Sequence, residues 1–270
     1  TARAGTRRCH THMSRVDVVT EASLVVAAVV ALVVVVLLLL GLVLVALVEV
    51  VALVVEPIQG EGGVLPATQA YLQAARELAD QVGALLIFDE VQTGMGRTGD
   101  LFAYQAYGVT PDILTSAKSL GGGFPIGAML TTAAAAQHFT PGTHGSTYGG
   151  NPLACAAGMA VLDVILEPGF LDQVKATGDR LRASLEQLIP NHDELFDSVR
   201  GMGLMLGLKL KHDSRAFVAH LRDNHGLLTV AAGDNVVRIL PPLNIDESHI
   251  AECIEKLSAG AASFVLPDAS

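Results

Sequence analysis

From Val50 onward, short apolar segments alternate with amphipathic ones, and this alternation constrains the fold more than any other feature of the sequence. Strands are predicted over residues 50–55, 84–88, 112–115 and 126–131, and helices over residues 68–82 and 151–166. Thr68 is a suitable N-cap, Gly83 suits the end of the first helix, and Asn151 before Pro152 suits the start of the second. Strands that recur every roughly 25–30 residues with helices between them are typical of βαβ units. The sequence therefore predicts an α/β domain with a mostly parallel sheet.

The segment Glu-Pro-Gly at residues 167–169 interrupts this pattern. Beyond it, helices are predicted near residues 170–188, 214–224 and 247–261, and strands near residues 196–200, 204–210, 227–230 and 236–240. Helices and strands in this order favour an α+β domain. The predicted domain organisation is an atypical apolar segment at residues 1–49, an α/β domain at residues 50–166 and a small C-terminal domain at residues 167–270.

Leu24 begins and Val48 ends a run of 25 residues that contains only Leu, Val, Ala and a single Gly. The run is long enough for a membrane-spanning helix, and arginines precede it, as the positive-inside rule expects. Its many β-branched valines favour strands instead, and it has no Trp or Tyr at its ends. Its monotony is also typical of low-complexity sequence that does not represent a natural coding segment. All three interpretations stay open, and membrane contact is not the favoured one.

The net charge of the chain argues against one class of partner. With 17 Lys and Arg against 27 Asp and Glu, the charge is −10 at pH 7, which does not suit binding to a phosphate backbone. The cysteines Cys9, Cys155 and Cys253 form no CxxC pair, and neither they nor the histidines have metal-ligand spacing. We therefore expect no nucleic-acid partner, no metal site and a reduced, cytoplasmic location.

Two sets of polar residues follow predicted strands, at the edge where parallel sheets place their chemistry. Asp89 and Glu90 come directly after the strand at residues 84–88. A buried carboxylate there can hold a positive charge, although a turn or capping role is the common alternative. Lys118 follows the strand at residues 112–115 and precedes three glycines. A lysine shielded from water becomes a nucleophilic amine more easily, although most lysines are simply solvated.

The context of two familiar motifs argues against nucleotide binding. Residues 94–99 match G-x-G-x-x-G, but they do not follow a strand directly and no long helix comes after them. We interpret them as a glycine-rich active-site loop rather than as a dinucleotide-binding turn. The apolar strand before Asp89 and Glu90 resembles a Walker B element, but the chain has no G-x-x-x-x-G-K-[ST] loop.

These features occur within a series of motifs that resembles the class III, pyridoxal-phosphate-dependent aminotransferases. The closest likeness is to the acetylornithine and succinylornithine aminotransferase group. The resemblance extends from about Val54 to Glu247 and is carried by residues 55–63, 88–94, 96–99, 107–112, 115–123, 144–152, 200–203 and 237–238. It implies a fold type I transferase architecture. A truncated, mostly parallel large domain at residues 50–166 would bind pyridoxal 5′-phosphate, and a small α+β domain would follow.

The resemblance also implies roles at the cofactor. Lys118 is similar to the lysine that bonds covalently to the cofactor aldehyde and later moves protons. Asp89 is similar to the partner of the pyridinium nitrogen, whose charge keeps that nitrogen protonated. Gln92 is similar to the residue near the phenolic oxygen, and Glu90 and Val91 belong to the same cofactor-binding segment. Asp89 and Lys118 are therefore the expected catalytic residues.

Four more residues take implied roles from the resemblance. Thr147 is similar to the threonine that reaches the cofactor phosphate, in the family from the neighbouring subunit. Ser146 would lie beside the bound substrate. Arg238 is similar to the arginine that binds a substrate carboxylate, for which its planar guanidinium is suited. Glu61 is similar to a glutamate that pairs with that arginine in related enzymes.

The activity implied is transfer of the δ-amino group of N-acetylornithine or succinylornithine to 2-oxoglutarate, which gives glutamate and a semialdehyde in arginine biosynthesis. The resembling enzymes are homodimers with shared sites. They also carry a longer N-terminal half with a turn that cradles the cofactor phosphate, and no such turn precedes Val50. The alternative hypothesis is therefore a catalytically inactive or fragmentary relative that acts only as a binding or membrane-tethered subunit.

Overall fold

The computed structural model describes residues 50–266. All the described helices and strands belong to one compact unit that begins at Val51. The interpretations of the apolar run that ends at Val48 concern residues outside the described part of the chain.

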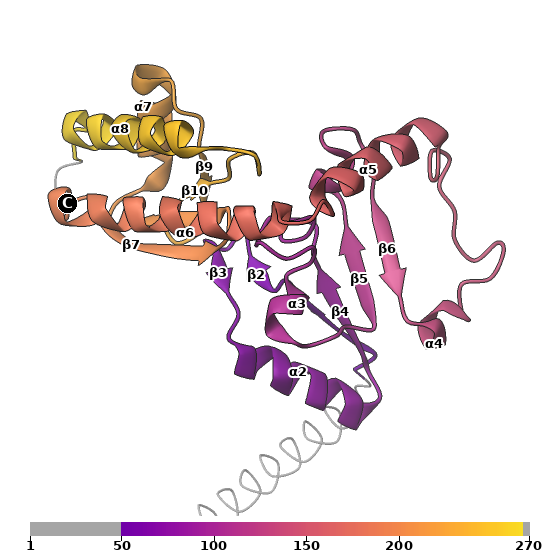
Figure 1. The fold of residues 1–270 in the computed structure, drawn as a ribbon. Coiled ribbons are helices and arrows are strands. Elements are labelled where there is room, and N and C mark those ends of the chain that lie inside the picture. Colours follow the sequence, from indigo (N-terminus) through magenta and orange to yellow (C-terminus); the bar gives the residue numbers. More distant parts are fainter. Residues whose placement is uncertain (1–49, 267–270) are drawn as a thin grey trace, which may run out of the picture. The chain divides into compact units, whose positions relative to one another are not determined.

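A four-stranded sheet forms the first half of this unit (Figure 1). In spatial order its strands are β1 (Ala52–Val55), β4 (Leu85–Asp89), β5 (Ile113–Ser116) and β6 (Ala128–Thr131). β1, β4 and β5 are parallel, and β6 runs antiparallel to β5. The mostly parallel sheet is thus confirmed, with the ends of β4 and β5 next to each other at one edge.

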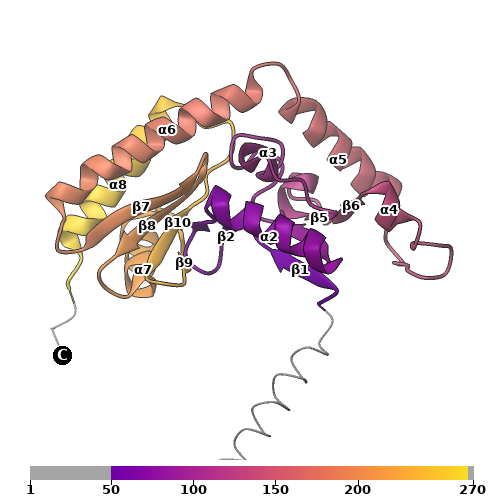
Figure 2. The same ribbon diagram turned by 90° about the horizontal axis from the view of Figure 1, so that it is seen from below.

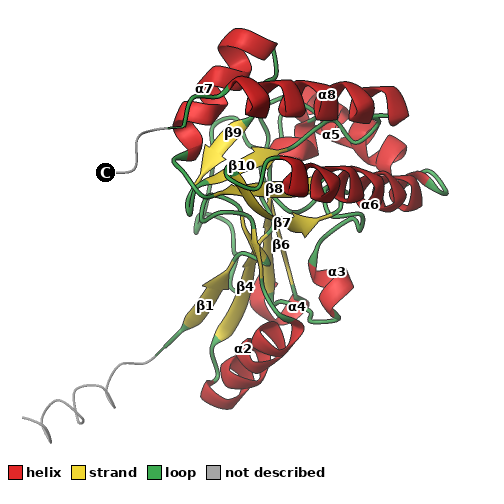
Figure 3. Cartoon of the chain, turned by 90° about the vertical axis from the view of Figure 1, so that its left-hand side faces the viewer, coloured by secondary structure: helices red, strands yellow, loops and turns green. Residues whose placement is uncertain are grey.

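Helix α2 (Gln69–Val82) packs against β1 and β4, beside which it lies in Figure 3. Its ends are the ones that the sequence predicts. The Thr68 Oγ1 accepts a hydrogen bond from the Tyr71 amide at 3.1 Å, and Gly83 ends the helix in the left-handed conformation, with φ of 70°. The buried face of the helix contacts a small core around Leu86 and Phe88.

Shorter elements complete the first half. They are β2 (Ile58–Gln59), β3 (Leu65–Pro66), α3 (Tyr104–Tyr107), the 3-10 helix η1 (Lys118–Gly121), α4 (Ala133–Ala136) and α5 (Pro152–Ile165). Helix α5 begins as predicted, because the Asn151 side chain accepts a hydrogen bond from the Ala154 amide at 2.9 Å and Pro152 occupies the first turn.

An ion pair joins α2 to the start of β5. The Asp112 Oδ2 accepts hydrogen bonds from the Arg76 Nη1 at 2.7 Å and from the Leu86 amide at 2.8 Å. Burial acts to raise the pKa of Asp112, but the bonds from Leu86 and Arg76 outweigh it, so the pKa lies below its ordinary value. The carboxylate therefore stabilises the packing of α2 on the sheet.

Replacing Asp112 with Asn is expected to lower the free energy of unfolding by about 1–3 kcal/mol, because Arg76 loses an anionic partner. Since the pKa of Asp112 is lower in the folded state, its stabilisation is complete above the unfolded value of about 4 and is lost as the pH falls through the folded value. Denaturant unfolding should therefore give a difference from wild type that shrinks at acidic pH, with the exposed Asp179→Asn as control. A difference that is constant with pH would contradict this account.

The second half is an antiparallel sheet covered by helices (Figure 2). Its strands, in spatial order, are β7 (Phe196–Met202), β8 (Met205–Leu210), β10 (Val236–Ile239) and β9 (Val230–Ala232). The helices are α6 (Phe170–Leu188), the 3-10 helix η2 (Ile189–Asn191), α7 (Ser214–His225) and α8 (Glu247–Ser263). Helices α6 and α8 lie side by side, and the largest apolar core lies between these helices and the sheet. The α+β character predicted for this half is confirmed.

One predicted strand lies elsewhere. The sequence places it at residues 227–230, but β9 starts at Val230. The Leu227 amide donates to the carbonyl of Leu221 at the end of α7, after Gly226 with φ of 60°. Leu227 therefore belongs to the helix C-cap, in which an apolar residue after the glycine commonly packs back on the helix.

Two further features of residues 50–266 bear on membranes and on exposed surface. No single helix among them has both the length and the apolar character needed to cross a membrane. Only the pair Pro152–Ile165 and Phe170–Asn191, bent by 73°, meets that requirement together. The first sheet leaves apolar side chains in solvent, with Val54 68% exposed on β1 and Met129 46% exposed on β6.

Candidate active site

Asp89 is the last residue of β4 and lies where the carboxyl ends of two parallel strands meet. It is half-buried and stands opposite Thr115 of β5 in the strand ladder. Its Oδ1 accepts a hydrogen bond from the Val91 amide at 2.9 Å, which orients the carboxylate. Within residues 50–266 its Oδ2 has no hydrogen-bond partner. Asp89 therefore presents a fixed carboxylate with one oxygen available for a ligand.

Arg238, on β10 of the second sheet, contacts the segment that follows this strand end and the loop that carries Glu61. Its side chain is only 5% exposed. The Arg238 Nη1 lies 2.7 Å from the Glu61 Oε1 and 3.1 Å from the Gln92 Oε1. The pairing of Glu61 with Arg238 that the resemblance implies is therefore formed. Glu61 is largely exposed and Arg238 is buried, so a solvent-facing carboxylate covers an otherwise enclosed guanidinium.

Gln92 reaches this position because Gly60 leaves room for it. A Cβ at Gly60 would lie 2.6 Å from the Gln92 Nε2, too close for any larger residue unless Gln92 moved. The Gln92 Oε1 accepts from Arg238, so its Nε2 is the atom left to donate. In the sequence, the only signal for this role of Gly60 is its place in the glycine-rich segment at residues 60–63.

Glu90 is the first residue after β4, and its carboxyl group has different partners from that of Asp89. Its side chain is buried, with 1% exposed. It accepts hydrogen bonds from the Thr93 hydroxyl at 2.6 Å and from the amides of Ala103 and Tyr104 at 2.8 Å each. Burial raises the pKa of Glu90 despite these three bonds. The predicted contact of Glu90 with a cofactor is therefore not one that its carboxyl group is placed to make.

Lys118 follows β5, the strand next to Asp89, and opens η1. Its side chain is exposed, and its backbone has φ of 47°, a conformation that residues other than glycine rarely adopt. Such strained positions cluster at functional sites. The turn behind it requires glycine, because Gly122 has φ of 57° and a Cβ there would lie 2.8 Å from the Val161 side chain.

The glycine-rich loop at residues 94–99 does not open a long helix, which supports its interpretation as an active-site loop. It is followed by α3, which has only four residues. Arg97 contacts the second half of the unit through its backbone and its side chain. Its carbonyl accepts a hydrogen bond from the Leu204 amide at 3.0 Å, and its guanidinium Nη1 donates to the carbonyls of Leu204 and Pro241. Burial lowers the pKa of Arg97. The loop thus connects the two sheets next to the candidate site.

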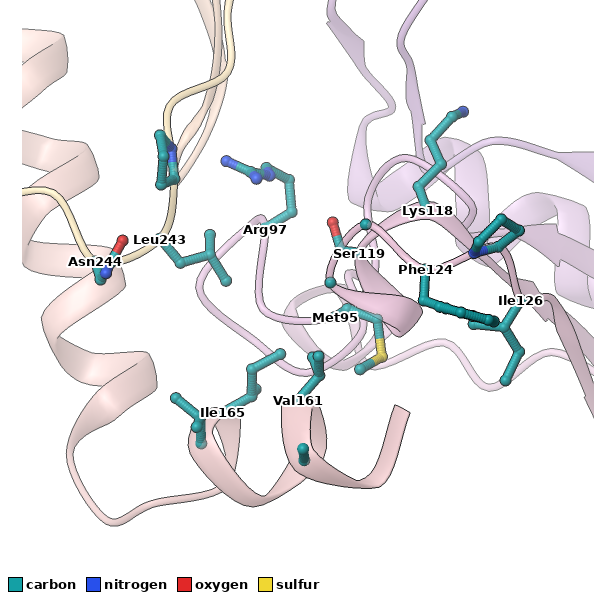
Figure 4. Close-up of a pocket in the computed structure, with 16 residues that line it drawn as sticks. Met95, Arg97, Lys118, Ser119, Phe124, Ile126, Val161, Ile165, Leu243 and Asn244 are labelled. Carbon is teal, nitrogen blue, oxygen red and sulfur yellow. The ribbon is translucent and has the colours of Figure 1, made fainter. Parts of the chain in front are cut away.

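A cavity of about 910 Å³ adjoins the loop that carries Lys118 (Figure 4). Its wall is mostly apolar and includes Met95, Phe124, Ile126, Val161, Ile165 and Leu243. In Figure 4 the Lys118 side chain extends away from Val161 and Ile165. Lys118 is itself among the residues that line the cavity.

Ser146 and Thr147 do not join the other predicted site residues within this chain. Both are exposed, and they belong to the segment between α4 and α5, which extends away from the ends of β4 and β5 in Figures 1 and 2. The structure thus brings together Gln92, Arg238 and Glu61, and Asp89 lies three residues before Gln92 at the end of β4. It places Lys118 after the neighbouring strand and leaves the Ser146–Thr147 pair apart.

Comparisons with known proteins point to one family. The family model described as "Aminotransferase class-III" matches residues 40–260. Acetylornithine aminotransferase 1 of Bradyrhizobium diazoefficiens is 56% identical over 212 residues, which are 78% of this chain and 52% of that protein. A succinylornithine transaminase/acetylornithine aminotransferase of Pseudomonas aeruginosa is 52% identical over 217 residues, 79% of this chain and 53% of that protein.

Solved structures give the same result. The N-acetylornithine aminotransferase of Stenotrophomonas maltophilia superposes with a TM-score of 0.71 at 42% identity, over 79% of this chain and 56% of that one. The ornithine aminotransferase of Plasmodium yoelii superposes with a TM-score of 0.72 at 34% identity, over 78% of this chain and 56% of that one. The chain thus spans about half the length of the curated relatives that it matches. With its fold and its motifs, the match over residues 40–260 shows that the chain belongs to the class-III aminotransferases, a pyridoxal-phosphate-dependent family.

Proposed function

We propose that this chain acts as a pyridoxal-phosphate-dependent aminotransferase that moves the δ-amino group of an N-acylornithine to 2-oxoglutarate. The observation that carries the proposal is the set of side chains at the ends of β4 and β5. There a carboxylate oxygen and an amide N–H, neither with a hydrogen-bond partner among residues 50–266, and an exposed lysine follow adjacent parallel strands. This donor set fits the ring nitrogen, the phenolic oxygen and the aldehyde of the cofactor.

Each side chain has a distinct task in this reaction. When bound, the cofactor supplies an aldehyde that takes up the amino group and a ring that accepts electrons from the adjacent carbon. Asp89 would hold a proton on the ring nitrogen, and the Gln92 Nε2 would donate to the phenolic oxygen. Lys118 would bind the cofactor and, once released, move the proton at the reacting substrate carbon, for which its amine must be neutral.

Arg238 is suited to bind the carboxylate of the substrate. Its guanidinium is enclosed, and its Nε is buried without a partner among the described residues. Glu61 pairs with it in this structure, and because Glu61 is largely exposed it can move aside into solvent. An incoming carboxylate would then replace one anionic partner by another, so Arg238 need not be left unpaired.

The choice of donor rests on the relatives, whose names specify acetylornithine, succinylornithine and ornithine. We expect the purified chain with pyridoxal phosphate and 2-oxoglutarate to form glutamate from N-acetylornithine faster than from ornithine or 4-aminobutyrate. A preference for 4-aminobutyrate would overturn the substrate and leave the chemistry standing. Failure with all three donors in folded protein would favour the inactive relative that acts only by binding.

We also infer a homodimer with a shared site, in a reduced, cytoplasmic compartment. The support is the exposed segment between α4 and α5, since Thr147 and Ser146 reach no cofactor position within their own chain. A second chain could supply them. Light scattering at micromolar concentration should give twice the mass of the chain. A monomer that binds the cofactor fully would contradict the shared site.

A further inference from the structure

Glu90 connects three parts of the chain around the strand end that carries Asp89. Its backbone amide donates to the carbonyl of Thr115 on β5 at 3.0 Å, and its carbonyl accepts from the Gly94 amide at 2.9 Å. Its carboxyl group binds Thr93 and the first amides of the α3 turn. All of the polar groups of Glu90 therefore have partners, and together they fix where the chain goes after β4.

This arrangement controls two neighbours that face the candidate site. Asp89 precedes Glu90 and Gln92 follows two residues later, so both share the backbone that Glu90 anchors. Gln92 lies in the turn closed between Glu90 and Gly94, and its side chain meets Arg238. A shift of this turn would move the Gln92 amide and the Val91 amide, to which the Asp89 Oδ1 is bonded.

We propose that Glu90 is a positioning residue that fixes Asp89 and Gln92 in the geometry needed for the cofactor ring, without touching the cofactor itself. This inference rests on the proposed function and assigns to Glu90 a role distinct from cofactor contact. It also gives a reason for a buried carboxyl group at this place, where burial and then the nearby charge of Asp89 raise the pKa of Glu90.

The variant Glu90→Gln tests this role because it keeps the shape of the side chain. One oxygen of Glu90 accepts from Tyr104 and the other accepts from Ala103 and Thr93. Whichever way the glutamine amide turns, its NH2 group faces a backbone N–H, so one of these bonds is lost. Thr93→Val, which replaces the buried hydroxyl by a methyl group, is the milder variant. Glu77→Gln is the matched control, because Glu77 is exposed on α2.

The measurements are the dissociation constant of pyridoxal phosphate, the absorption spectrum of the bound cofactor and amide exchange at residues 103 and 104 in the cofactor-free protein. In Glu90→Gln we expect affinity to fall about tenfold, a shifted spectrum and loss of protection at one of the two amides. Thr93→Val should show a smaller change and Glu77→Gln none. A spectral shift that is measured well below the unfolding temperature of the variant separates positioning from a general loss of stability.

Each outcome decides the matter. Wild-type affinity and spectrum in a folded Glu90→Gln protein would overturn the positioning role and leave the proposed function intact. If the wild-type chain binds no pyridoxal phosphate, the proposed function fails. Amide exchange alone then tests whether Glu90 anchors the segment after β4. Protection lost in Glu90→Gln would support the anchoring of Asp89 and Gln92, and unchanged protection would overturn it.

Discussion

Replacing Lys118 with Ala is expected to reduce transamination by about 10³-fold or more, because both covalent attachment of the cofactor and proton transfer would lose their amine. The fold should be unaffected. Lys118 is exposed and has φ of 47°, so alanine experiences the same backbone strain as lysine and no packing is removed. Glutamate formation from N-acetylornithine, measured with saturating pyridoxal phosphate, gives the size of the effect.

The matched control for this change is Lys211→Ala, since Lys211 is also exposed. It should keep wild-type turnover, which excludes a general effect of removing a surface charge. Turnover within tenfold of wild type in Lys118→Ala would mean that another group carries the chemistry.

The second large effect is expected at Asp89. Asp89→Asn keeps the hydrogen bond from the Val91 amide, because the asparagine Oδ1 can still accept it. What is lost is the negative charge that would keep a proton on the ring nitrogen. Turnover should fall by about 10²-fold or more, the scale found when a preorganised electrostatic contact is removed, while some cofactor still binds.

Two measurements separate this explanation from simple damage to the site. The unfolding midpoint of Asp89→Asn should match that of wild type within experimental error, and Asp179→Asn, a change of an exposed aspartate, should leave turnover unchanged. Near-normal turnover in Asp89→Asn would contradict the role of the charge.

The local elements of this fold can be predicted from the sequence because their signals are local. Thr68 and Gly83 delimit α2, and Asn151 with Pro152 begins α5, since capping depends on neighbouring residues only. The antiparallel direction of β6 has no such signal. It follows from pairing with β5, and strand direction is a property of the partner and of the connection between them.

The candidate site likewise has a part that the sequence predicts and a part that it does not. Asp89 and Lys118 can be recognised as polar residues after buried strands, and parallel pairing then places their strand ends together. The contact between Gln92 and Arg238 joins residues 146 positions apart, so no spacing rule could give it, and only the resemblance to a family pointed to Arg238. Asp89 and Glu90 bind different partners, and which of the two would face the site depended on the packing of the loop before α3.

Labelling of Lys118 tests the central claim most directly. Reduction of the chain with borohydride in the presence of pyridoxal phosphate makes the bond between the cofactor and its lysine permanent, and peptide mapping then locates the added mass. The account predicts the label on Lys118 and its absence from Lys118→Ala. A label on another lysine, or an unlabelled protein that is folded, would contradict it.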